Sequence, residues 1–280
     1  MKAYPVTLLC KVMEVSRSGF YRYIKTCDHP NPDGDCGLLA DVKAVFEGSG
    51  GTYGSRRMAK ALRALGYSAG RFQARSLMRK LELKVIPTKR FKVTTDSKHT
   101  LAVAPNVLAR EFDVKAPDTV WGGDITYLWT QAGWLYLAVI IDLYSRKVVG
   151  WAMDRTMTTD LVIDALTMAV WRRRPKPGLI HHTDRGSQYA SHEYQRLLTN
   201  WGMVCSMSRK GDCWDNAVVE RFFRSLKTER TNHRLYRTRE QVKQDVVDYI
   251  EMFYNSRRLH SYLGYVSPNE FESVELRKAA

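Results

Sequence analysis

The chain has 280 residues, a length that suits one catalytic domain of about 150 residues with smaller flanking modules. Its hydrophobic content of 44% is ordinary for a globular protein. The net charge is +15, from 44 Lys and Arg against 29 Asp and Glu, which is typical of proteins with a polyanionic partner such as nucleic acid. None of the five cysteines has a partner at two-residue spacing, which argues against a disulfide framework and a structural zinc site.

The cellular location follows from the same features. The first residues have no long apolar core with a cleavage site, so we expect no signal peptide. The longest apolar run, residues 135–141, is too short to span a bilayer and instead predicts a buried strand. Together with the cysteine content, these features predict a cytoplasmic, nucleoid-associated protein.

The positive charge is concentrated in the first half of the chain. Between Arg56 and Lys92 there are twelve Lys or Arg and a single acid, Glu82. From Pro117 to the end, 23 basic residues stand against 19 acidic ones. We therefore expect the first half to be the main DNA-holding part and the second half to use its acids for another purpose.

The N-terminal part predicts small helical modules. Residues 1–26 have helix-turn-helix character, since Leu8, Leu9 and Val12 share one helix face and a second helix can begin at Phe20. A linker rich in Pro, Gly and Asp follows at 27–37.

Residues 38–84 predict a second all-α, DNA-binding domain. We expect helices at 38–46, at 55–65 with Ser55 as the N-cap, and at 71–81. The alternative is a set of basic helices that packs on a partner. Residues 85–116, which contain two prolines, predict an extended basic linker.

The pattern changes from helical to β at Val120. Three strand candidates joined by tight turns predict an antiparallel meander, after which helices and strands alternate. The expected strands are 120–129, 134–142, 147–153, 179–183 and 204–207, and the expected helices are 159–171, 192–201, 216–228 and 239–256. We therefore predict an α/β catalytic domain at 117–232 with helices on both faces of its sheet, followed by a helical extension at 233–280.

Three acidic residues occupy positions suited to catalysis. Asp124 lies in the first strand between apolar neighbours, where a carboxylate is costly unless it is paired or binds metal. Asp184 follows a strand end, the place where open α/β sheets bind ligands. Glu220 lies in the helix that follows the last strand.

These three carboxylates predict a site for hard divalent cations. If the strands of Asp124 and Asp184 are neighbours, the two carboxylates can approach one another, and the helix of Glu220 can lean over the same edge. Oxygen ligands of this kind suit Mg²⁺ or Mn²⁺, and two such ions can activate the attacking oxygen and stabilise the leaving oxygen in phosphoryl transfer.

The spacing and the surrounding sequence resemble a known family. Thirty-five residues separate Asp184 from Glu220, as in the Asp-Asp-Glu motif of retroviral integrases and related insertion-sequence transposases. The segments WGGDITYL, HTDRGSQY, DNAVVERFFRSLKTE, YNSRRLHSYLGYVSPNEF and YGSRRMAKALRALGY are similar to the second reading frame (OrfB) of bacterial insertion sequences. The resemblance covers nearly the whole chain, with one departure at residues 213–216, where Trp214 follows Cys213 instead of a small residue. We expect this departure to alter loop packing and not the chemistry.

The resemblance implies a ribonuclease-H-like integrase core with a mixed five-stranded sheet, preceded by helix-turn-helix modules. It implies that Asp124, Asp184 and Glu220 are the catalytic, metal-binding residues for two Mg²⁺ or Mn²⁺ ions. It also implies cleavage at the terminal inverted repeats of an element, transfer of the ends into target DNA, and a homo-oligomer on DNA. Lys227, two helical turns after Glu220, matches a basic residue that contacts terminal DNA in that family.

Further DNA contacts are expected from basic side chains in both halves. Most should touch phosphate and contribute affinity more than specificity. These residues are Arg17, Arg56, Arg57, Arg71, Arg75, Lys210, Arg221 and Arg224.

Several other features have two interpretations. The histidines at 181 and 182 either assist the metal site or pack at the strand end. Three aromatic residues, Tyr189, Trp214 and Phe222, either stack on splayed bases or belong to the core.

The function has alternatives as well. A nuclease of the same fold would cut without joining, and a DNA-binding regulator would have an acidic triad without catalytic use. The chain could also require an upstream-frame (OrfA) protein, or fusion to it by frameshifting, for activity.

Overall fold

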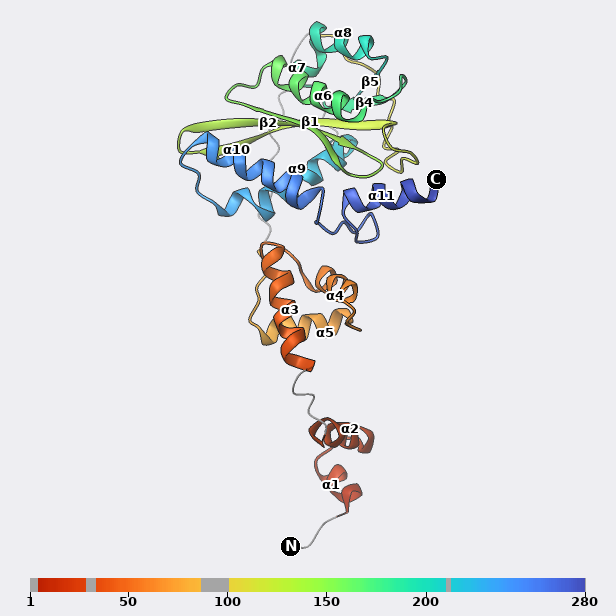
Figure 1. Ribbon diagram of the computed structural model, residues 1–280, viewed down its shortest axis with the longest axis vertical. Helices are drawn as coiled ribbons and strands as arrows, with labels where there is room; N and C mark the ends of the chain where they lie inside the picture. Colours follow the sequence, from red (N-terminus) through yellow and green to blue (C-terminus); the bar gives the residue numbers. More distant parts are fainter. Residues whose placement is uncertain (1–4, 29–33, 87–100, 210–212, 280) are drawn as a thin grey trace. The chain divides into compact units, whose positions relative to one another are not determined.

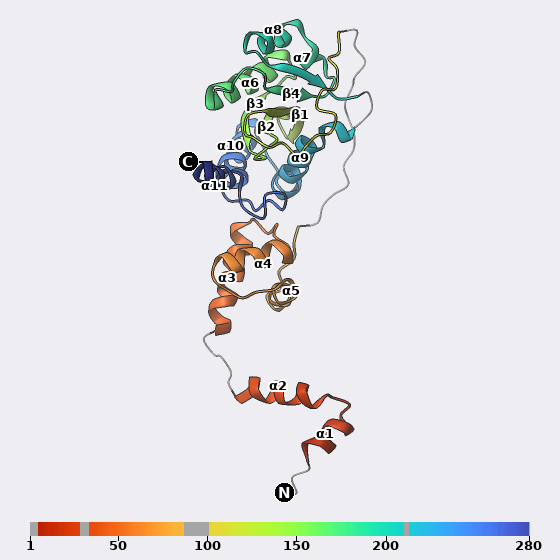
Figure 2. The ribbon, with the colours of Figure 1, turned by 90° about the vertical axis from the view of Figure 1, so that its right-hand side faces the viewer.

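The computed structural model describes residues 5–28, 34–86, 101–209 and 213–279, and these fall into two compact units. The first unit comprises residues 1–48 and 54–83, and the second comprises 49–53 and 84–280. Figures 1 and 2 show the helical first unit and the α/β second unit. No helix in the described parts of the chain is long and apolar enough to cross a membrane.

The first unit is all-α, as the sequence predicts. Its helices are α1 (Val6–Val12), α2 (Arg17–Asp28), α3 (Gly34–Gly48), α4 (Ser55–Ala64) and α5 (Arg71–Lys80). A common apolar core joins the last three helices and includes Val42, Met58, Leu62 and Ala74, each almost fully buried. The N-cap of α4 is Gly54, and Ser55 is the first helical residue, so the prediction that Ser55 caps this helix is wrong.

The second unit is a five-stranded mixed sheet between helices. Its strands are β1 (Val120–Thr130), β2 (Gly133–Asp142), β3 (Val148–Asp154), β4 (Ile180–Thr183) and β5 (Val204–Met207). The strand order is β3-β2-β1-β4-β5, with antiparallel pairing among the first three and parallel pairing of β4 with β1 and β5. This arrangement confirms the predicted meander and the crossover that follows it.

Helices cover both faces of this sheet (Figure 1). On one face lie α6 (Thr159–Arg173), α7 (Ser187–Ala190) and α8 (His192–Asn200), and on the other lie α9 (Ala217–Glu229) and α10 (Arg239–Val247). The first group of helices forms the main core with alternate residues of the central strands, among them Ile140 and Trp121. The strands are therefore buried on both sides, which explains the nearly continuous apolar run of β2.

The long helix predicted over 239–256 is present to Tyr254, but its second half is π-helical and not α-helical. Helix α10 ends at Val247, and a π-helical segment, η3 (Asp248–Tyr254), continues the chain. Wider turns of this kind bring Tyr249, Phe253 and Tyr254 together in a buried aromatic group. Asn255, directly after the segment, bonds to both the N–H and the carbonyl of Val148. Helix α11 (Pro268–Ala279) was not predicted, and two short 3₁₀ helices, η1 (Cys213–Asn216) and η2 (Thr231–His233), flank α9.

The described half of the predicted linker, residues 101–116, has no helix or strand but packs on the second unit. Leu108 is buried with Val120 and Leu143. The backbone N–H groups of Val107 and Leu108 donate to the hydroxyl of Ser206, at 2.9 and 3.1 Å. This part of the segment turns at Ala109 and Arg110, which have positive φ, and is held against the sheet; residues 87–100 lie outside the described part of the chain.

Candidate active site

The first two predicted acids lie where two parallel strands diverge. Strand β1 pairs with β2 over its whole length, but its pairing with β4 covers only Val120–Gly122. Asp124 is two residues beyond this pairing, and Asp184 is the first residue after β4. The edge of β1 that β4 leaves uncovered therefore brings the two aspartates into the same region, at the carboxyl end of β4.

The third acid reaches this region because two glycines precede Asp124. A Cβ atom at Gly122 would lie 2.8 Å from Val219 of α9, and one at Gly123 would lie 3.0 Å from the ring of His181. The bare backbone therefore lets α9 approach β1 closely. The side-chain amide of Asn216, at the start of α9, also donates to the carbonyl of Gly123 at 3.3 Å. Glu220, in the first turn of α9, is thereby directed toward Asp124.

The three carboxylates interact electrostatically. Burial raises the pKa of Asp124 well above its usual value, and repulsion by Asp184 and Glu220 raises it further. The N–H of Ile125, 2.8 Å from the Asp124 carboxylate, and the charge of Lys227 act in the opposite direction. Burial also raises the pKa of Glu220. The site thus places two further carboxylates within electrostatic range of Asp124.

Asp184 and Tyr189 complete the immediate surroundings. The Asp184 carboxylate accepts the N–H of Gly186 at 2.9 Å, which fixes its orientation within a tight turn. The Tyr189 hydroxyl is buried and has no hydrogen-bond partner among the described residues. Burial is the main cause that raises the pKa of Tyr189, and the charges of Asp124 and Asp184 raise it further. A buried hydroxyl without a protein partner therefore lies within electrostatic range of both aspartates.

These carboxylates do not form a compact three-ligand cage. Among the residues that the structure describes, no three His, Cys, Asp or Glu side chains are close enough to bind one ion together. Asp184 and Glu220 are nonetheless near enough to raise the pKa of Asp124.

The two histidines before Asp184 are committed to the fold. His181 bonds through Nε2 to the hydroxyl of Tyr194 at 2.7 Å, and His182 bonds to Ser206 and Ser208 at 2.8 and 3.2 Å. Burial lowers their pKa values to about 3 and about 4, respectively. Both rings are therefore neutral packing groups at neutral pH, which is the second of the two interpretations above.

The structure decides between the two interpretations for two of the three aromatic residues. Tyr189 and Phe222 are each 1% exposed and belong to the core, so the stacking interpretation is wrong for them. The side chain of Trp214 lies outside those that the structure describes.

The predicted DNA contacts fall into two sets. In the first unit, Arg17, Arg56, Arg71 and Arg75 are exposed and Arg57 is partly buried. In the second unit, Arg221 and Arg224 are exposed on α9. Lys227 is partly buried, with its ammonium 4.8 Å from the centre of the Tyr127 ring. Lys210 lies outside the described residues.

The sequence interpretation missed Asp215, which is fully buried just before α9. Its carboxylate accepts bonds from the side chains of Arg209, Arg110 and Asn106, at 2.8 to 3.1 Å. The hydrogen bonds from Arg209 hold its pKa well below the usual range. Asp215 therefore ties the extended segment at 101–116 to the start of the helix that holds Glu220. The sequence signal that could have indicated this role is an acid that lies between a basic loop and the start of a helix.

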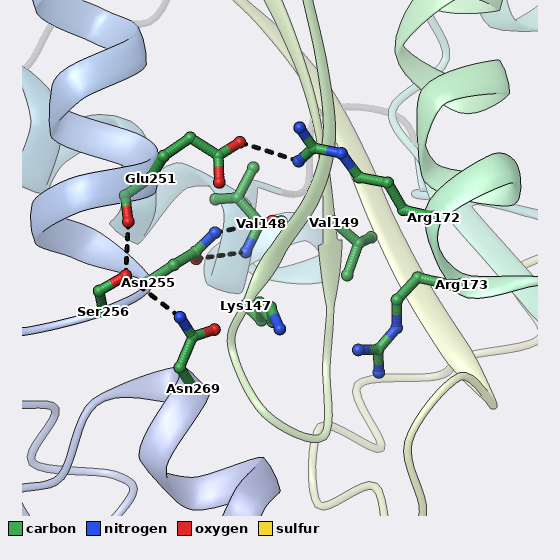
Figure 3. A pocket seen from close by; sticks show the side chains of 9 residues that line it. All are labelled: Lys147, Val148, Val149, Arg172, Arg173, Glu251, Asn255, Ser256 and Asn269. Carbon is green, nitrogen blue, oxygen red and sulfur yellow. Dashed lines mark hydrogen bonds and ion pairs between the residues drawn. The ribbon is translucent and has the colours of Figure 1, made fainter.

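A surface cavity of about 280 Å³ lies at a different place, between the start of β3, the end of α6, η3 and the start of α11 (Figure 3). Two of the cations that line it are neutralised by neighbouring acids. Arg172 pairs with Glu251 at 2.8 Å, and Lys147 pairs with Glu272 at 3.0 Å. These contacts make the lining of the cavity part of a structural ion network, and the cavity is separate from the three candidate catalytic carboxylates.

Comparisons with known proteins identify the family. The "Integrase core domain" family matches residues 114–213, a second family of that description matches 220–276, and an "HTH-like domain" matches 34–91. The transposase InsF of insertion sequence IS3A from Escherichia coli K12 is 40% identical over 98% of this chain and 96% of its own. The chain belongs to the IS3 family of transposases. A 31 kDa protein of insertion element IS600 from Shigella sonnei is 41% identical over 97% of this chain and 100% of its own.

The family assignment gives the general function, which is DNA transposition by an integrase-type core with a DNA-binding helix-turn-helix domain. It also confirms the predicted ribonuclease-H-like fold class. Among solved structures, the HTLV-2 integrase catalytic core domain in complex with magnesium matches with a TM-score of 0.44 and 18% identity. That match covers 55% of this chain and 96% of the other.

Proposed function

We propose that this IS3-family transposase cuts DNA at the ends of its insertion sequence and joins the resulting 3′-hydroxyl to target DNA. We assign Asp124, Asp184 and Glu220 as the catalytic, metal-binding carboxylates. One observation carries the assignment: acids from three elements, β1, the end of β4 and the first turn of α9, interact, because Asp184 and Glu220 further raise the pKa of Asp124 that burial has already raised. Such an arrangement is costly for the fold alone and is typical of functional sites.

The residues present fit two divalent cations. All three ligands are hard oxygen donors, which Mg²⁺ and Mn²⁺ prefer. The repulsion at Asp124 would be offset by the ions, and the unpartnered hydroxyl of Tyr189 could bond to water in their coordination shell. Two ions that share the carboxylates need only part of their ligands from the protein, because DNA oxygens and water supply the rest. The absence of a three-ligand cage among the described residues is compatible with this division.

In the proposed mechanism, bound metal supplies Lewis-acid activation of the attacking and leaving oxygens. Asp124 and Asp184 would hold the ions at the edge of β1 that β4 leaves uncovered, and Glu220 would complete the protein ligands from α9. Lys227, on the same face of α9, would contact terminal DNA beside the scissile phosphate. The same residues serve both steps, because only the nucleophile changes from water to the DNA 3′-hydroxyl.

The exposed basic residues have a separate task in this proposal. Arg17, Arg56, Arg71 and Arg75 would hold the terminal repeats through their phosphates. Arg57 and Lys210 are assigned to DNA as well, and Arg221 and Arg224 would hold the cut strand. We further propose that the protein acts in the cytoplasm as a homo-oligomer on DNA, with an upstream-frame (OrfA) protein as a partner.

A strand-transfer assay tests the proposal. Purified protein is mixed with a pre-cut element end, target plasmid and Mg²⁺ or Mn²⁺, beside the Asp184→Asn variant. Joined products that disappear in the variant support the assignment. Nicking without joining by the protein, with the upstream-frame protein present, would instead support a nuclease. Binding without any cleavage would support a regulator.

A further inference from the structure

Next to the candidate active site, an aromatic surface lies on the β1–β2 hairpin. Trp129 is 58% exposed and Trp134, directly opposite it on β2, is 43% exposed. Their ring centres are 4.7 Å apart at 69°. Cross-strand aromatic pairs stabilise hairpins, but two tryptophans with about half of their surface in solvent offer more apolar area than that role requires.

The hairpin turn holds this pair in a fixed position. Gly133 has a φ of +100°, a backbone conformation that the turn between the two strands requires and that glycine tolerates. The N–H of Gln131 donates to the carbonyl of Tyr236, and Arg239 donates to the carbonyl of Trp134, both at 2.9 Å. The tip of the hairpin is thus tied to the segment before α10.

A continuous series of contacts links the pair to the carboxylates. Tyr127 packs against Trp134 in an edge-to-face manner, with ring centres 5.0 Å apart. The ammonium of Lys227 lies over the Tyr127 ring and within electrostatic range of Asp124. The order is therefore Asp124, Lys227, Tyr127, Trp134 and Trp129, which runs from the site to the tip of the hairpin.

The charge and dimensions of this surface suit a nucleic-acid strand. Basic residues lie among the aromatic ones, with Lys227 at one end and the exposed Arg237 and partly buried Arg239 beside the tip. Aromatic faces between cations are the usual platform for unpaired nucleotides. Asp124 and Trp129 are five residues apart on β1, roughly 16 Å at about 3.3 Å per residue, and their side chains belong to opposite faces of the strand. A DNA strand that reaches both would pass round the edge of β1 that β4 leaves uncovered, beside the contact of Lys227 with Tyr127.

We propose that Tyr127, Trp129 and Trp134 form a stacking platform for unpaired nucleotides of the element end, close to the phosphate that reacts at the carboxylate site. This proposal rests on the proposed function, since it takes the carboxylate site as the place of cleavage. The platform would keep the terminal strand separated from its complement while the end is cut and joined.

The test uses DNA binding and crosslinking, which do not require catalysis. The probe is a duplex of the element's terminal sequence, either fully paired or unpaired over its last nucleotides, with 4-thiothymidine at successive positions near the cut. The variants are Trp129→Ala, Trp134→Ala and Trp129→Phe. Trp171→Ala is the matched control, because Trp171 is 73% exposed at the far end of α6.

We expect Trp129→Ala and Trp134→Ala to bind the unpaired end about tenfold more weakly and the paired end nearly as the original protein does. Trp129→Phe should recover most of the loss, and Trp171→Ala should bind normally. Crosslinks should map to Trp129 or Trp134. Asp184→Asn should keep both binding and crosslinks, so failure of the catalytic assignment would be distinguishable from failure of the platform.

Two results would overturn the proposal. Equal affinity of the Trp129→Ala variant for paired and unpaired ends, with crosslinks mapping elsewhere, would exclude stacking at this surface. A change in oligomeric state without DNA, measured by light scattering for Trp129→Ala but not for Trp171→Ala, would make the surface an interface between copies of the chain.

Discussion

Two groups of partly buried carboxylates at different places in the second unit differ in how their charge is neutralised. In the first, repulsion by Asp184 and Glu220 adds to the effect of burial on the pKa of Asp124, and Lys227 acts in the opposite direction. In the second, Asp118 and Glu272 lie around Arg173, whose guanidinium bonds to both carboxylates at 2.8 to 3.1 Å. Lys147 adds a further bond to Glu272 at 3.0 Å.

This difference distinguishes a group of acids that stabilises the fold from a group suited to bind a ligand. The Arg173 group joins the start of β1, the end of α6 and α11 through complementary charges, so its acids stabilise the fold. In the Asp124 group, Asp184 and Glu220 repel Asp124 instead, so a bound cation would relieve that repulsion. Burial alone would have assigned both groups the same role.

The largest expected effect is the loss of strand transfer in Asp124→Asn. Removing one metal ligand should reduce the rate of joining by a factor on the order of 10³ or more, because the metals contribute several kcal/mol to the transition state. Without metal, the free energy of unfolding should stay the same or rise, since a repulsive charge is removed. Gel-based strand transfer and urea denaturation measure the two quantities, with the exposed Asp154→Asn as control. A variant that joins DNA normally would remove Asp124 from the site.

Arg173→Met should lower the free energy of unfolding and leave strand transfer intact, the reverse of Asp124→Asn. It leaves Asp118, Asp142 and Glu272 without their main cation, and removing one partner of a buried pair typically costs about 3–5 kcal/mol. The remaining folded protein should still join DNA. Arg172→Met is the matched control, because the partly exposed Arg172 pairs with Glu251 and should contribute about 0–1 kcal/mol. Equal midpoints for the two variants in urea denaturation would show that the Arg173 network adds little stability.

The comparison also shows what the sequence could predict. The five strands and the helix of Glu220 were predicted because their apolar patterns and turns are local signals. The candidate acids were located by strand ends and by family spacing. None of the pairings of Arg173 was predicted, because its partners Asp118 and Glu272 lie 55 and 99 residues away in sequence. Local patterns carry no information about contacts of that kind.

The other differences have physical causes of the same type. The change from α- to π-helical hydrogen bonding after Val247 accompanies the packing of Tyr249, Phe253 and Tyr254 in the tertiary structure, which the helical periodicity does not show. The exposed Trp129 and Trp134 look like ordinary strand residues in sequence. Their exposure follows from the position of the hairpin beyond the end of β4, which only the strand pairing establishes.

A smaller effect is expected from Asn216→Ala, which tests how α9 is attached to β1 beside the Asp124 group. The substitution removes the bond to the buried Gly123 carbonyl, at a cost of about 1–3 kcal/mol in unfolding free energy. The displaced Glu220 should lower the rate of joining about tenfold and raise the Mg²⁺ concentration needed for half-maximal rate. Metal titrations of strand transfer, with the exposed Asn200→Ala beside it, measure this effect. An unchanged metal requirement would restrict Asn216 to a purely structural role.

The smallest effect concerns pH and the weakest contact of the Arg173 group. Burial raises the pKa of Asp142 from 3.8 to about 7, and its contact with Arg173, at 3.4 Å, is longer than those of Asp118 and Glu272. Between about pH 4 and pH 7 the folded protein therefore binds more protons at this position than the unfolded chain does. Stability should fall as pH rises through this window, by at most about 1.4 kcal/mol per pH unit from this group.

The Asp142→Asn variant isolates this contribution. Asparagine keeps an oxygen that can accept the N–H of Tyr144, now at 3.0 Å from the carboxylate, but it cannot titrate. The difference in unfolding free energy between the variant and the original protein should therefore increase from pH 5 to pH 7 in favour of asparagine. Urea denaturation at a series of pH values provides the measurement. If the unfolding free energies of the two proteins stay parallel over this pH range, Arg173 keeps Asp142 ionised throughout. The contrast between the two carboxylate groups would then be complete, because every acid around Arg173 would be neutralised by a cation.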